Sequence, residues 1–297
     1  MTPASESDSP TRLARALSFL RGTLAGCADS FTAVEEGWLA LTPSLPRVWF
    51  GNQLRLRGPL ELDALLAAAE RHLSGLPYRQ VVLEGDGSGL ESPLRDRGWQ
   101  LTRLVVMALA RPPSAPSPPA GRADARVIAS LDEAQWAEAY RRWHLEDPRV
   151  TPEDADQLAA MGLREGRVRG DRRFGVLAGD GRSAQAIASL RGDGGVAQVE
   201  DVWTTPEARG RGYARALVTH ALLCVAGKAA PAGGAVAAAQ PAADHPPGAP
   251  AARGPASVAD QLTFIVADDE DWPKQLYARL GFAPVGCLWE FHRDPPA

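Results

Sequence analysis

The feature that most constrains the fold is a unit that occurs twice in the chain. Residues 81–109 align without a gap on residues 264–292, at a constant offset of 183 residues. In both copies an apolar run precedes a short helical segment, a glycine (Gly98, Gly281) and an aromatic residue. Such a glycine allows the positive φ that ends a helix, and the aromatic fills the core where the next strand begins. We therefore expect one fold used twice.

Two segments of biased composition divide the chain. Residues 111–124 include the run PPSAPSPPAG, which favours extended, solvated conformations and predicts a linker. Residues 227–260 are rich in Ala, Pro and Gly, and their prolines exclude a continuous helix, so we expect a disordered insertion there. The remaining chain divides into a disordered tail at 1–11, a first half at 12–110 and a second half at 125–297.

Hydrophobic periodicity predicts helices and strands in both halves, and the class is therefore α/β (mixed α+β). The first half is expected to contain helices at 11–26, 60–73 and 90–97, and strands at 37–42, 48–56, 79–84 and 101–109. The second half is expected to contain strands at 125–129, 173–178, 183–191, 196–204, 262–267 and 285–292, and helices that begin at 130 or cover 211–225 and 273–280. Ser130 and Glu133 are expected to form a capping box.

Composition limits the classes of function. The chain has 297 residues, of which 45% are hydrophobic and 23% charged, enough for about two ordinary domains. No apolar run reaches the roughly 20 residues of a membrane span, and the first residues are polar, so we expect neither membrane insertion nor secretion. Three scattered cysteines predict a reducing, cytoplasmic setting and no Cys-rich zinc site. A net charge of -4 argues against a nucleic-acid partner.

Residues 196–218 contain a strand, a glycine-rich turn and a helix in succession. Amides at the start of a helix lack intrahelical acceptors and lie at the positive end of its dipole, and glycines let a bulky anion approach the backbone. Two arginines add formal charge at the same turn. The segment therefore predicts a pyrophosphate site, formed by Arg209, Gly210, Arg211, Gly212, Tyr213 and Ala214.

The turn is a weak signal by itself, because Arg, Gly and Ala are frequent in this chain. Its position between a strand and a helix, together with the phrase LYARLGF at 276–282, is more specific. Together these segments resemble the GNAT superfamily of acyl-CoA-dependent N-acetyltransferases over most of residues 125–292. The resemblance implies acetyl-CoA as co-substrate, no metal, and a mixed, mostly antiparallel sheet flanked by helices in each half. It also implies direct attack by a primary amine of a small molecule or peptide in a ternary complex.

The resemblance also assigns roles to single residues. Arg209, Gly212 and Ala214 match the family's pyrophosphate-binding turn, and Tyr277 matches a tyrosine that faces the coenzyme's sulfur in many members. Glu200 lies on the strand where many members place a carboxylate that draws a proton from the amine. Main-chain groups of Val202, Trp203 and Thr204 are expected to contact the coenzyme, with an N–H near Val202 or Trp203 meeting the oxyanion. Strand alternation is expected to turn Asp201 to the opposite face.

The chemistry explains why a carboxylate is useful here. For a lysine-like amine with a pKa near 10.4, only about one molecule in 2,500 is neutral at pH 7. Deprotonating the amine at this pH therefore costs roughly 4.6 kcal/mol of free energy. Glu200 can act as the base if burial or Asp201 raises its pKa, and Tyr277 can protonate the leaving thiolate. The alternatives are a solvent-facing Glu200 and a Tyr277 that only packs in the core or against the coenzyme. Trp143 is a candidate for the acceptor wall, with core packing as its alternative.

The first half resembles the same fold without its functional residues. Leu94 stands at the offset position of Tyr277, and Gly58 is followed by Pro59, which has no N–H to donate. We expect this half to bind no coenzyme and to form one wall of the acceptor cleft. The layout is similar to that of tandem GNAT proteins, mycothiol synthase among them. We expect the protein to be a monomer or a homodimer. The alternatives are an acyl-CoA-binding sensor without turnover, a longer acyl chain, or an amino-sugar thiol precursor as acceptor.

Overall fold

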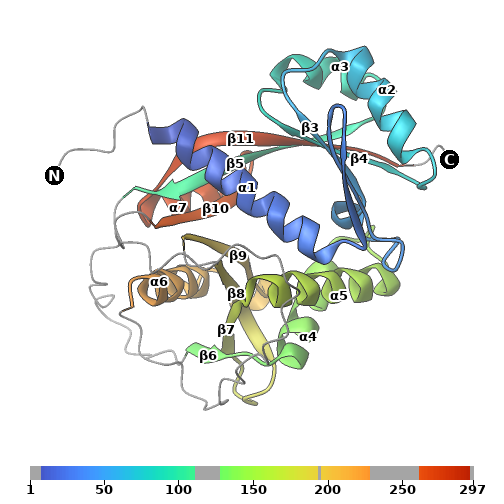
Figure 1. The fold of residues 1–297 in the computed structure, drawn as a ribbon. Helices are drawn as coiled ribbons and strands as arrows, with labels where there is room; N and C mark the ends of the chain where they lie inside the picture. The colour runs from blue at the N-terminus through green and yellow to red at the C-terminus, as the bar shows by residue number, and fades with distance from the viewer. Residues whose placement is uncertain (1–7, 111–127, 193–194, 228–260, 295–297) are drawn as a thin grey trace, which may run out of the picture.

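A single sheet connects the two halves of the molecule. The structure is a computed structural model that describes residues 8–110, 128–192, 195–227 and 261–294. Within these residues eleven strands form one sheet in the order β1-β2-β3-β4-β11-β5-β10-β9-β8-β7-β6 (Figure 1). The expected α/β class with a mixed, mostly antiparallel sheet is confirmed. The linker predicted at 111–124 and nearly all of the insertion predicted at 227–260 lie outside the described residues.

The first half follows the predicted order with two differences. Its elements are α1 (Ser9–Cys27), β1 (Ser30–Val34), β2 (Gly37–Leu41), β3 (Gln53–Arg57), α2 (Leu62–Leu73), β4 (Arg79–Glu84), α3 (Glu91–Arg95) and β5 (Gln100–Leu109). Strand β1 was not predicted, because it is an edge strand with no buried residue and so carries little hydrophobic pattern. The strand predicted from residue 48 begins only at Gln53, after a 3₁₀ turn at Trp49–Gly51. Helix α1 begins at Ser9, inside the segment expected to be a disordered tail.

The second half contains one long helix that the sequence analysis missed. Its elements are β6 (Ile128–Ser130), α4 (Glu133–His144), α5 (Pro152–Arg169), β7 (Arg172–Leu177), β8 (Ala184–Gly192), β9 (Val196–Thr204), α6 (Tyr213–Val225), β10 (Leu262–Asp268), α7 (Pro273–Arg279) and β11 (Phe282–Arg293). Helix α5 has a Thr151–Asp154 capping box, and Gly170 ends it in the left-handed region. A capping box is typical of the start of a helix, and a left-handed glycine is typical of its end. The predicted capping box of α4 was wrong: the residues that form it are Asp132 and Gln135.

The last strand of each half is inserted into the other half. Strand β5 pairs antiparallel with β10 and β11, and β11 pairs antiparallel with β4 and β5. On either side of this centre the neighbouring strands are parallel, β3 with β4 and β9 with β10. From β1 to β7 the sequence of parallel and antiparallel pairs reads the same from both ends, and β6 adds one further strand at the edge of the second half. The repeated unit of the sequence thus has a spatial counterpart.

The strand exchange also joins the hydrophobic cores. Val105 and Met107 of β5 are buried in the core beneath α6, which is otherwise built by the second half. Trp289 and Phe291 of β11 are buried in the core beneath α2, which is otherwise built by the first half. Each core is therefore completed by residues from the other copy of the unit.

The glycines of the repeat have the predicted conformation. Gly98 has φ 77° and Gly281 has φ 97°, and each ends a short helix. The following aromatic residues, Trp99 and Phe282, are each 3% exposed. The expectation that these aromatics fill the two cores where a strand begins is confirmed.

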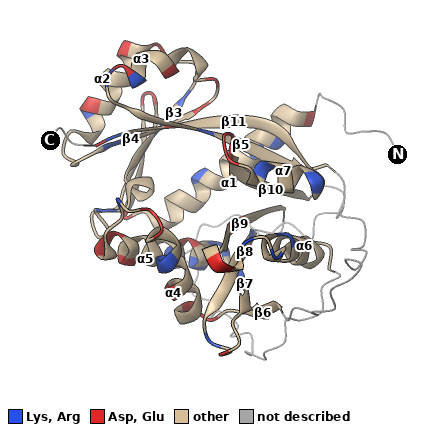
Figure 2. Ribbon diagram, turned by 180° about the vertical axis from the view of Figure 1, so that it is seen from behind, with Lys and Arg blue, Asp and Glu red and all other residues tan. Residues whose placement is uncertain are grey.

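Helix α1 crosses one face at the middle of the sheet, over β5, β10 and β11 (Figure 1). Phe19 meets Phe264 of β10 edge to face, with ring centroids 5.7 Å apart. Arg169 of α5 donates to the Thr23 hydroxyl of α1 over 2.8 Å, which ties the two helices together. Acidic and basic residues occur on both halves (Figure 2). Among the described residues, none of the helices has the length and apolar character to cross a membrane.

Candidate active site

The sheet opens between β9 and β10. These parallel strands pair only over Val196–Val199 and Leu262–Ile265. Beyond this point β9 continues to Thr204 beside β8, and β10 continues to Asp268 beside β5. The corresponding strands of the first half, β3 and β4, pair through their last residues. An opening at the carboxyl ends of parallel strands is therefore present in the second half and closed in the first.

A β-bulge in β9 redirects the side chains at this opening. Ser189 of β8 faces Glu200 and Ile187 faces Trp203, so Asp201 and Val202 stand opposite one residue. Asp201 has φ 57°, a conformation that aspartate adopts more readily than most residues. Strict alternation fails here, and Glu200 and Asp201 line the same cavity. The prediction that Asp201 turns to the face opposite Glu200 was therefore wrong, because the bulge changes the period of the strand.

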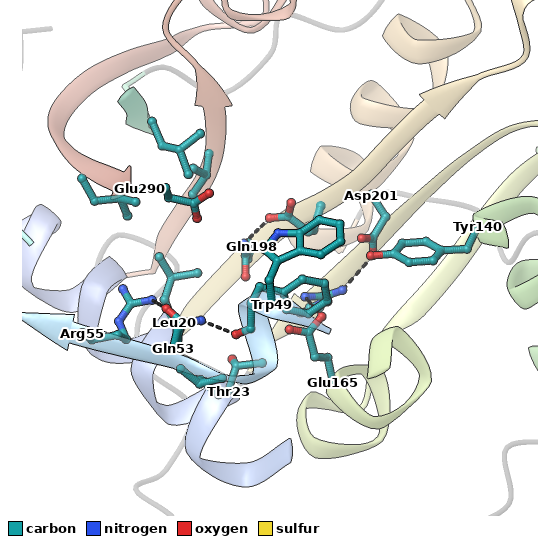
Figure 3. Close-up of a pocket in the computed structure, with 17 residues that line it drawn as sticks. Leu20, Thr23, Trp49, Gln53, Arg55, Tyr140, Glu165, Gln198, Asp201 and Glu290 are labelled. Atoms are coloured by element: carbon teal, nitrogen blue, oxygen red, sulfur yellow. Dashed lines mark hydrogen bonds and ion pairs between the residues drawn. The ribbon is translucent and has the colours of Figure 1, made fainter. Parts of the chain in front are cut away.

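The cavity has a volume of about 280 Å³ and receives side chains from both halves of the chain (Figure 3). The first half contributes Gln53 and Arg55 of β3 and an apolar wall from α1 and the 3₁₀ turn. The second half contributes Tyr140 of α4 and a set of charged residues from α5, β8, β9 and β11. That set consists of Glu165, Arg191, Glu200, Asp201 and Glu290.

A buried ion-pair network supports the bulge. Arg191 of β8 lies 3.0 Å from a carboxylate oxygen of Glu165 and 2.8 Å from one of Asp201. The Ser189 hydroxyl donates to the same Asp201 oxygen over 2.5 Å. Burial of a charge is costly unless the charge is paired, and here one guanidinium satisfies two carboxylates. The network holds Asp201 in place beside Glu200.

Glu200 has the electrostatic environment of a base. Burial raises its pKa to about 8, and the negative charge of Asp201 acts in the same direction, while Arg191 opposes both. The Gln198 side-chain amide donates to the Glu200 carboxylate. A pKa of about 8 suits general-base chemistry near neutral pH better than the ordinary value near 4.5.

The glycine-rich turn has the conformation expected of an anion site. Gly210 has φ 75° and Gly212 has φ 78°, and Gly212 directly precedes α6. Around a Cβ position on Gly210 there is no heavy atom within 4 Å, so the backbone is open to an approaching group. In the described part of the chain, neither the Gly210 nor the Gly212 N–H donates to a protein acceptor. The Thr204 hydroxyl, at the end of β9, is likewise buried without a partner among these residues.

The two arginines of the turn are held by protein groups. Arg209 donates to the Glu146 carboxylate and to the Thr204 carbonyl, and Arg211 donates to the Glu207 carbonyl. Glu146, which follows α4, also accepts a 2.9 Å hydrogen bond from the Trp203 indole. The Arg209 side chain remains 56% exposed. It is accessible to a ligand that competes with Glu146.

Tyr277 lies in the core and outside the cavity lining. It is 6% exposed and packs against Phe282, with ring centroids 6.4 Å apart. Burial raises its pKa well above the ordinary value, and the negative charges of Glu200 and Asp271 add to the shift. Tyr277 therefore keeps its proton at neutral pH.

Helix α4 contributes a different aromatic residue from the one proposed. Trp143 is stacked on His144 and packs beside the aromatic cluster of α4, and it does not line the cavity. Tyr140, one turn earlier, does line it and is stacked on Trp136. Helical periodicity placed both residues near one face, but only the packing of α4 against α5 decides which ring reaches the cavity.

Several lining residues were missed by sequence reasoning, namely Glu165, Arg191 and Glu290. Glu165 lies on the helix that was not predicted, and Arg191 and Glu290 lie on strands that carry no motif. The alternation of β8 was the one available signal, because Ser189 and Arg191 are buried polar residues two positions apart in an apolar strand. Among the described residues no cluster of three or more His, Cys, Asp or Glu has a geometry that could hold a metal ion.

Comparison with known proteins agrees with this geometry. The family model described as the acetyltransferase (GNAT) family matches residues 128–242. That segment contains β9 with its bulge and the glycine-rich turn, and so one side of the opening. No curated protein has a sequence similar enough to count as a relative.

Solved structures resemble the whole chain in fold. A functionally unknown conserved protein from Staphylococcus epidermidis is 13% identical with a TM-score of 0.59, and the match covers 89% of this chain and 93% of that one. A GCN5-related N-acetyltransferase from Kribbella flavida is 19% identical with a TM-score of 0.52, covering 96% of both chains. A GCN5-related N-acetyltransferase from Sphaerobacter thermophilus is 15% identical with a TM-score of 0.52, covering 99% and 95%.

These likenesses show the fold, and the family match indicates acyl transfer as the chemistry. Enzymes of the family generally use acetyl-CoA, and the open turn and the splayed strands described above fit that group. Residues 128–242 therefore match the model of the acetyltransferase (GNAT) family, and the fold of the chain is similar to that of solved GNAT acetyltransferases.

Proposed function

We propose that this protein transfers an acetyl group from acetyl-CoA to a primary amine, by direct attack in a ternary complex. The observation that carries the proposal is the position of Glu200. It lies on β9, one residue beyond the point where the strand leaves β10, and its side chain lines the cavity. A volume of about 280 Å³ favours a small molecule, or the end of a peptide side chain, over a folded partner.

The glycine-rich turn would hold the coenzyme pyrophosphate. Helix α6 has thirteen residues, and its first amides lie at the positive end of the helix dipole. Gly210 and Gly212 leave room at the backbone, and Arg209 can exchange Glu146 for a phosphate. The first half has no equivalent site, because β3 and β4 stay paired and the Gly58 N–H already donates to the Glu84 carbonyl.

Acetyl-CoA would supply an acetyl thioester to the opening between β9 and β10. Glu200 would accept the proton of the attacking amine, and its raised pKa suits that role. A main-chain N–H at Val202 or Trp203, on the edge of β9 that has left β10, would meet the oxyanion. Tyr277 would donate to the departing thiolate. Because its pKa is raised, it is a weaker acid than a free tyrosine, and its role depends on a direct contact with the sulfur.

Calorimetric titration with acetyl-CoA tests the coenzyme site. We expect saturable binding by the wild type and weaker binding by Arg209→Ala. The matched control is Arg95→Ala, because the Arg95 side chain is 57% exposed, close to the 56% of Arg209, and lies on α3 of the first half. The absence of heat at high micromolar acetyl-CoA would refute the proposed function.

Thiol release from acetyl-CoA across a panel of amines tests turnover. The proposed enzyme releases thiol with at least one amine, and Tyr277→Phe slows this release with nearly unchanged coenzyme affinity. Binding without release on any amine would instead identify a protein that binds acyl-CoA without turnover. Replacing acetyl-CoA by longer acyl-CoA molecules in the same assay identifies the preferred acyl chain.

A further inference from the structure

The cavity contains a charged residue that the proposed acetyl transfer does not use. Glu290 lies on β11, which is separated from β9 in the sheet by β5 and β10. Its side chain lines the same cavity as Glu200. Figure 3 shows the Glu290 carboxylate directed toward the space beside Gln198. Burial raises the pKa of Glu290, Arg55 opposes this shift, and Asp268 adds to it. In its ionised form, a carboxylate in this position is stabilised by a positively charged partner.

The two basic residues of the cavity form their ion pairs with other carboxylates, although Arg55 Nη2 and Arg191 Nε are buried without a hydrogen-bond acceptor among the described residues. Arg191 is paired with Glu165 and Asp201. Arg55 is 2.9 Å from Glu84, a buried carboxylate that lies outside the lining and also pairs with Arg21. Neither guanidinium forms an ion pair with Glu200 or Glu290. Within the described residues, these two carboxylates of the lining therefore form no ion pair with Arg or Lys, although Arg191 and Arg55 act on them at longer range.

A second, independent group in the cavity also lacks a partner. Gln198 is 2% exposed and lines the cavity, and its side-chain N–H donates to Glu200. Its side-chain carbonyl oxygen has no hydrogen-bond partner among the described residues. A buried carbonyl left in this state is destabilising, and a ligand N–H can satisfy it. Two carboxylates and one amide oxygen thus offer acceptors, and an ammonium group has three donors.

We propose that the acceptor carries a second amine, protonated when it binds, whose charge pairs with Glu290 and whose N–H reaches the Gln198 carbonyl while the reacting amine faces Glu200. The substrate class is then a small molecule with two amino groups on a short apolar chain. Trp49 and Phe50 offer an apolar wall for that chain. This inference rests on the proposed function, because it names the acceptor of that reaction.

The same charges predict which amines are rejected. An acceptor with a carboxylate at the far end would face Glu290 with its own negative charge, and Arg55 and Arg191 are already paired. A monoamine would fill the cavity but leave Glu290 and the Gln198 carbonyl without a partner. Specificity is a difference of such free energies, so diamines should exceed both other classes.

The test compares acceptors of equal chain length on the full-length protein with acetyl-CoA. The probes are putrescine, butylamine and γ-aminobutyrate, and diamines from propane to hexane to find the best spacing. We expect kcat/KM for the best diamine to exceed that for the monoamine of equal length by about tenfold or more, mainly through KM. γ-Aminobutyrate should be the poorest of the three. Equal kcat/KM for putrescine and butylamine, with no better diamine, would overturn the inference.

The variant Glu290→Gln tests the residue itself, because it removes the charge and keeps the size of the side chain. The ratio of kcat/KM between diamine and monoamine should fall to near one in this variant. Glu61→Gln is the matched control, because Glu61 is exposed and lies before α2, away from the cavity, and the ratio should persist. A ratio that survives Glu290→Gln in a folded variant would overturn the assignment of Glu290.

Failure of the proposed function can be told apart from failure of this inference. Acetylation of monoamines and diamines at equal rates refutes only the inference. If no amine releases thiol, acetyl transfer is refuted, and calorimetric binding of the diamine to the same samples then decides the role of Glu290. Binding of putrescine that Glu290→Gln weakens about tenfold would support a diamine site, and absence of binding would refute it.

Discussion

Arg191 donates to the Asp201 carboxylate over 2.8 Å, and both side chains are 4% exposed. The pair joins β8 to the bulge of β9, where Asp201 has a positive φ. Glu165 of α5 binds the other side of the same guanidinium. The residue beside the proposed base is thus held by two strands and a helix, and the geometry of Glu200 depends on a network outside the motif.

Loss of Arg191 should strongly destabilise the fold. Removing one partner of a buried ion pair leaves an uncompensated charge, and Arg191→Met would leave two, so we expect a loss of about 3–5 kcal/mol in the free energy of unfolding. Urea denaturation measures it. Arg141→Met is the control, because its pair with Asp156 is exposed and should contribute at most about 1 kcal/mol. Similar losses for both variants would contradict the importance of the network.

The rate should depend on pH through Glu200. Only the deprotonated carboxylate accepts a proton, and its pKa is raised to about 8, so kcat/KM should rise with pH and show an inflection there. Glu200→Gln should lower kcat/KM by about 10²–10⁴-fold and remove this inflection, leaving only the titration of the amine. An inflection that persists in Glu200→Gln would assign it to another group.

The charged and titratable neighbours that influence this profile come from several elements. Asp201 and Glu165 raise the Glu200 pKa, and Arg191 lowers it. Tyr277, whose pKa is raised in part by Glu200, stays protonated across this range. A protonated amine near Glu200 would lower its pKa, so the inflection in kcat should lie below that in kcat/KM.

Freeing Arg209 should strengthen coenzyme binding. Glu146 occupies the Arg209 guanidinium, and a bound phosphate has to displace it. Exposed ion pairs contribute about 0.2–1 kcal/mol, so Glu146→Gln should raise acetyl-CoA affinity by at most about fivefold, as measured by calorimetry. Glu138→Gln is a control on α4, because Glu138 pairs with Arg142 and not with the turn. Weaker binding in Glu146→Gln would show that Glu146 positions the turn instead.

The second half should not fold without the first. Strand β5 separates β10 from β11, and its Val105 and Met107 fill the core beneath α6. A chain that begins at residue 125 would expose that core and leave β10 unpaired on one edge. We expect no cooperative unfolding transition by circular dichroism, and recovery when residues 1–124 are supplied as a second chain. A stable, cooperative fragment alone would contradict the strand exchange.

Local signals predicted the elements that have buried faces and clear ends. Strand β4 was predicted with its observed bounds, and the glycine and aromatic residues of the repeat have the expected conformation and burial. The edge strand β1 was missed because exposure removes the pattern on which prediction relies. Helix α5 was missed although Thr151, Pro152 and Gly170 mark its ends.

The candidate site was predicted in part. The turn at Gly210 and Gly212 and the strand with Glu200 were located from sequence, because a strand, a glycine-rich turn and a helix are contiguous in the chain. The face of Asp201 was predicted wrongly, since one bulge reverses the alternation after Glu200. Roles of Glu200 and Tyr277 stay predictions.

By itself the sequence determined the class of fold, the repeated unit and the turn that resembles a coenzyme site, because each depends on residues close together along the chain. Tertiary structure alone decided that β5 and β11 exchange places and that Glu290 and Arg55 share a cavity with Glu200. Those residues are far apart in sequence, and their proximity follows from strand pairing and core packing. The charge left unpaired in the cavity, and hence the proposed diamine acceptor, is a property of that packing.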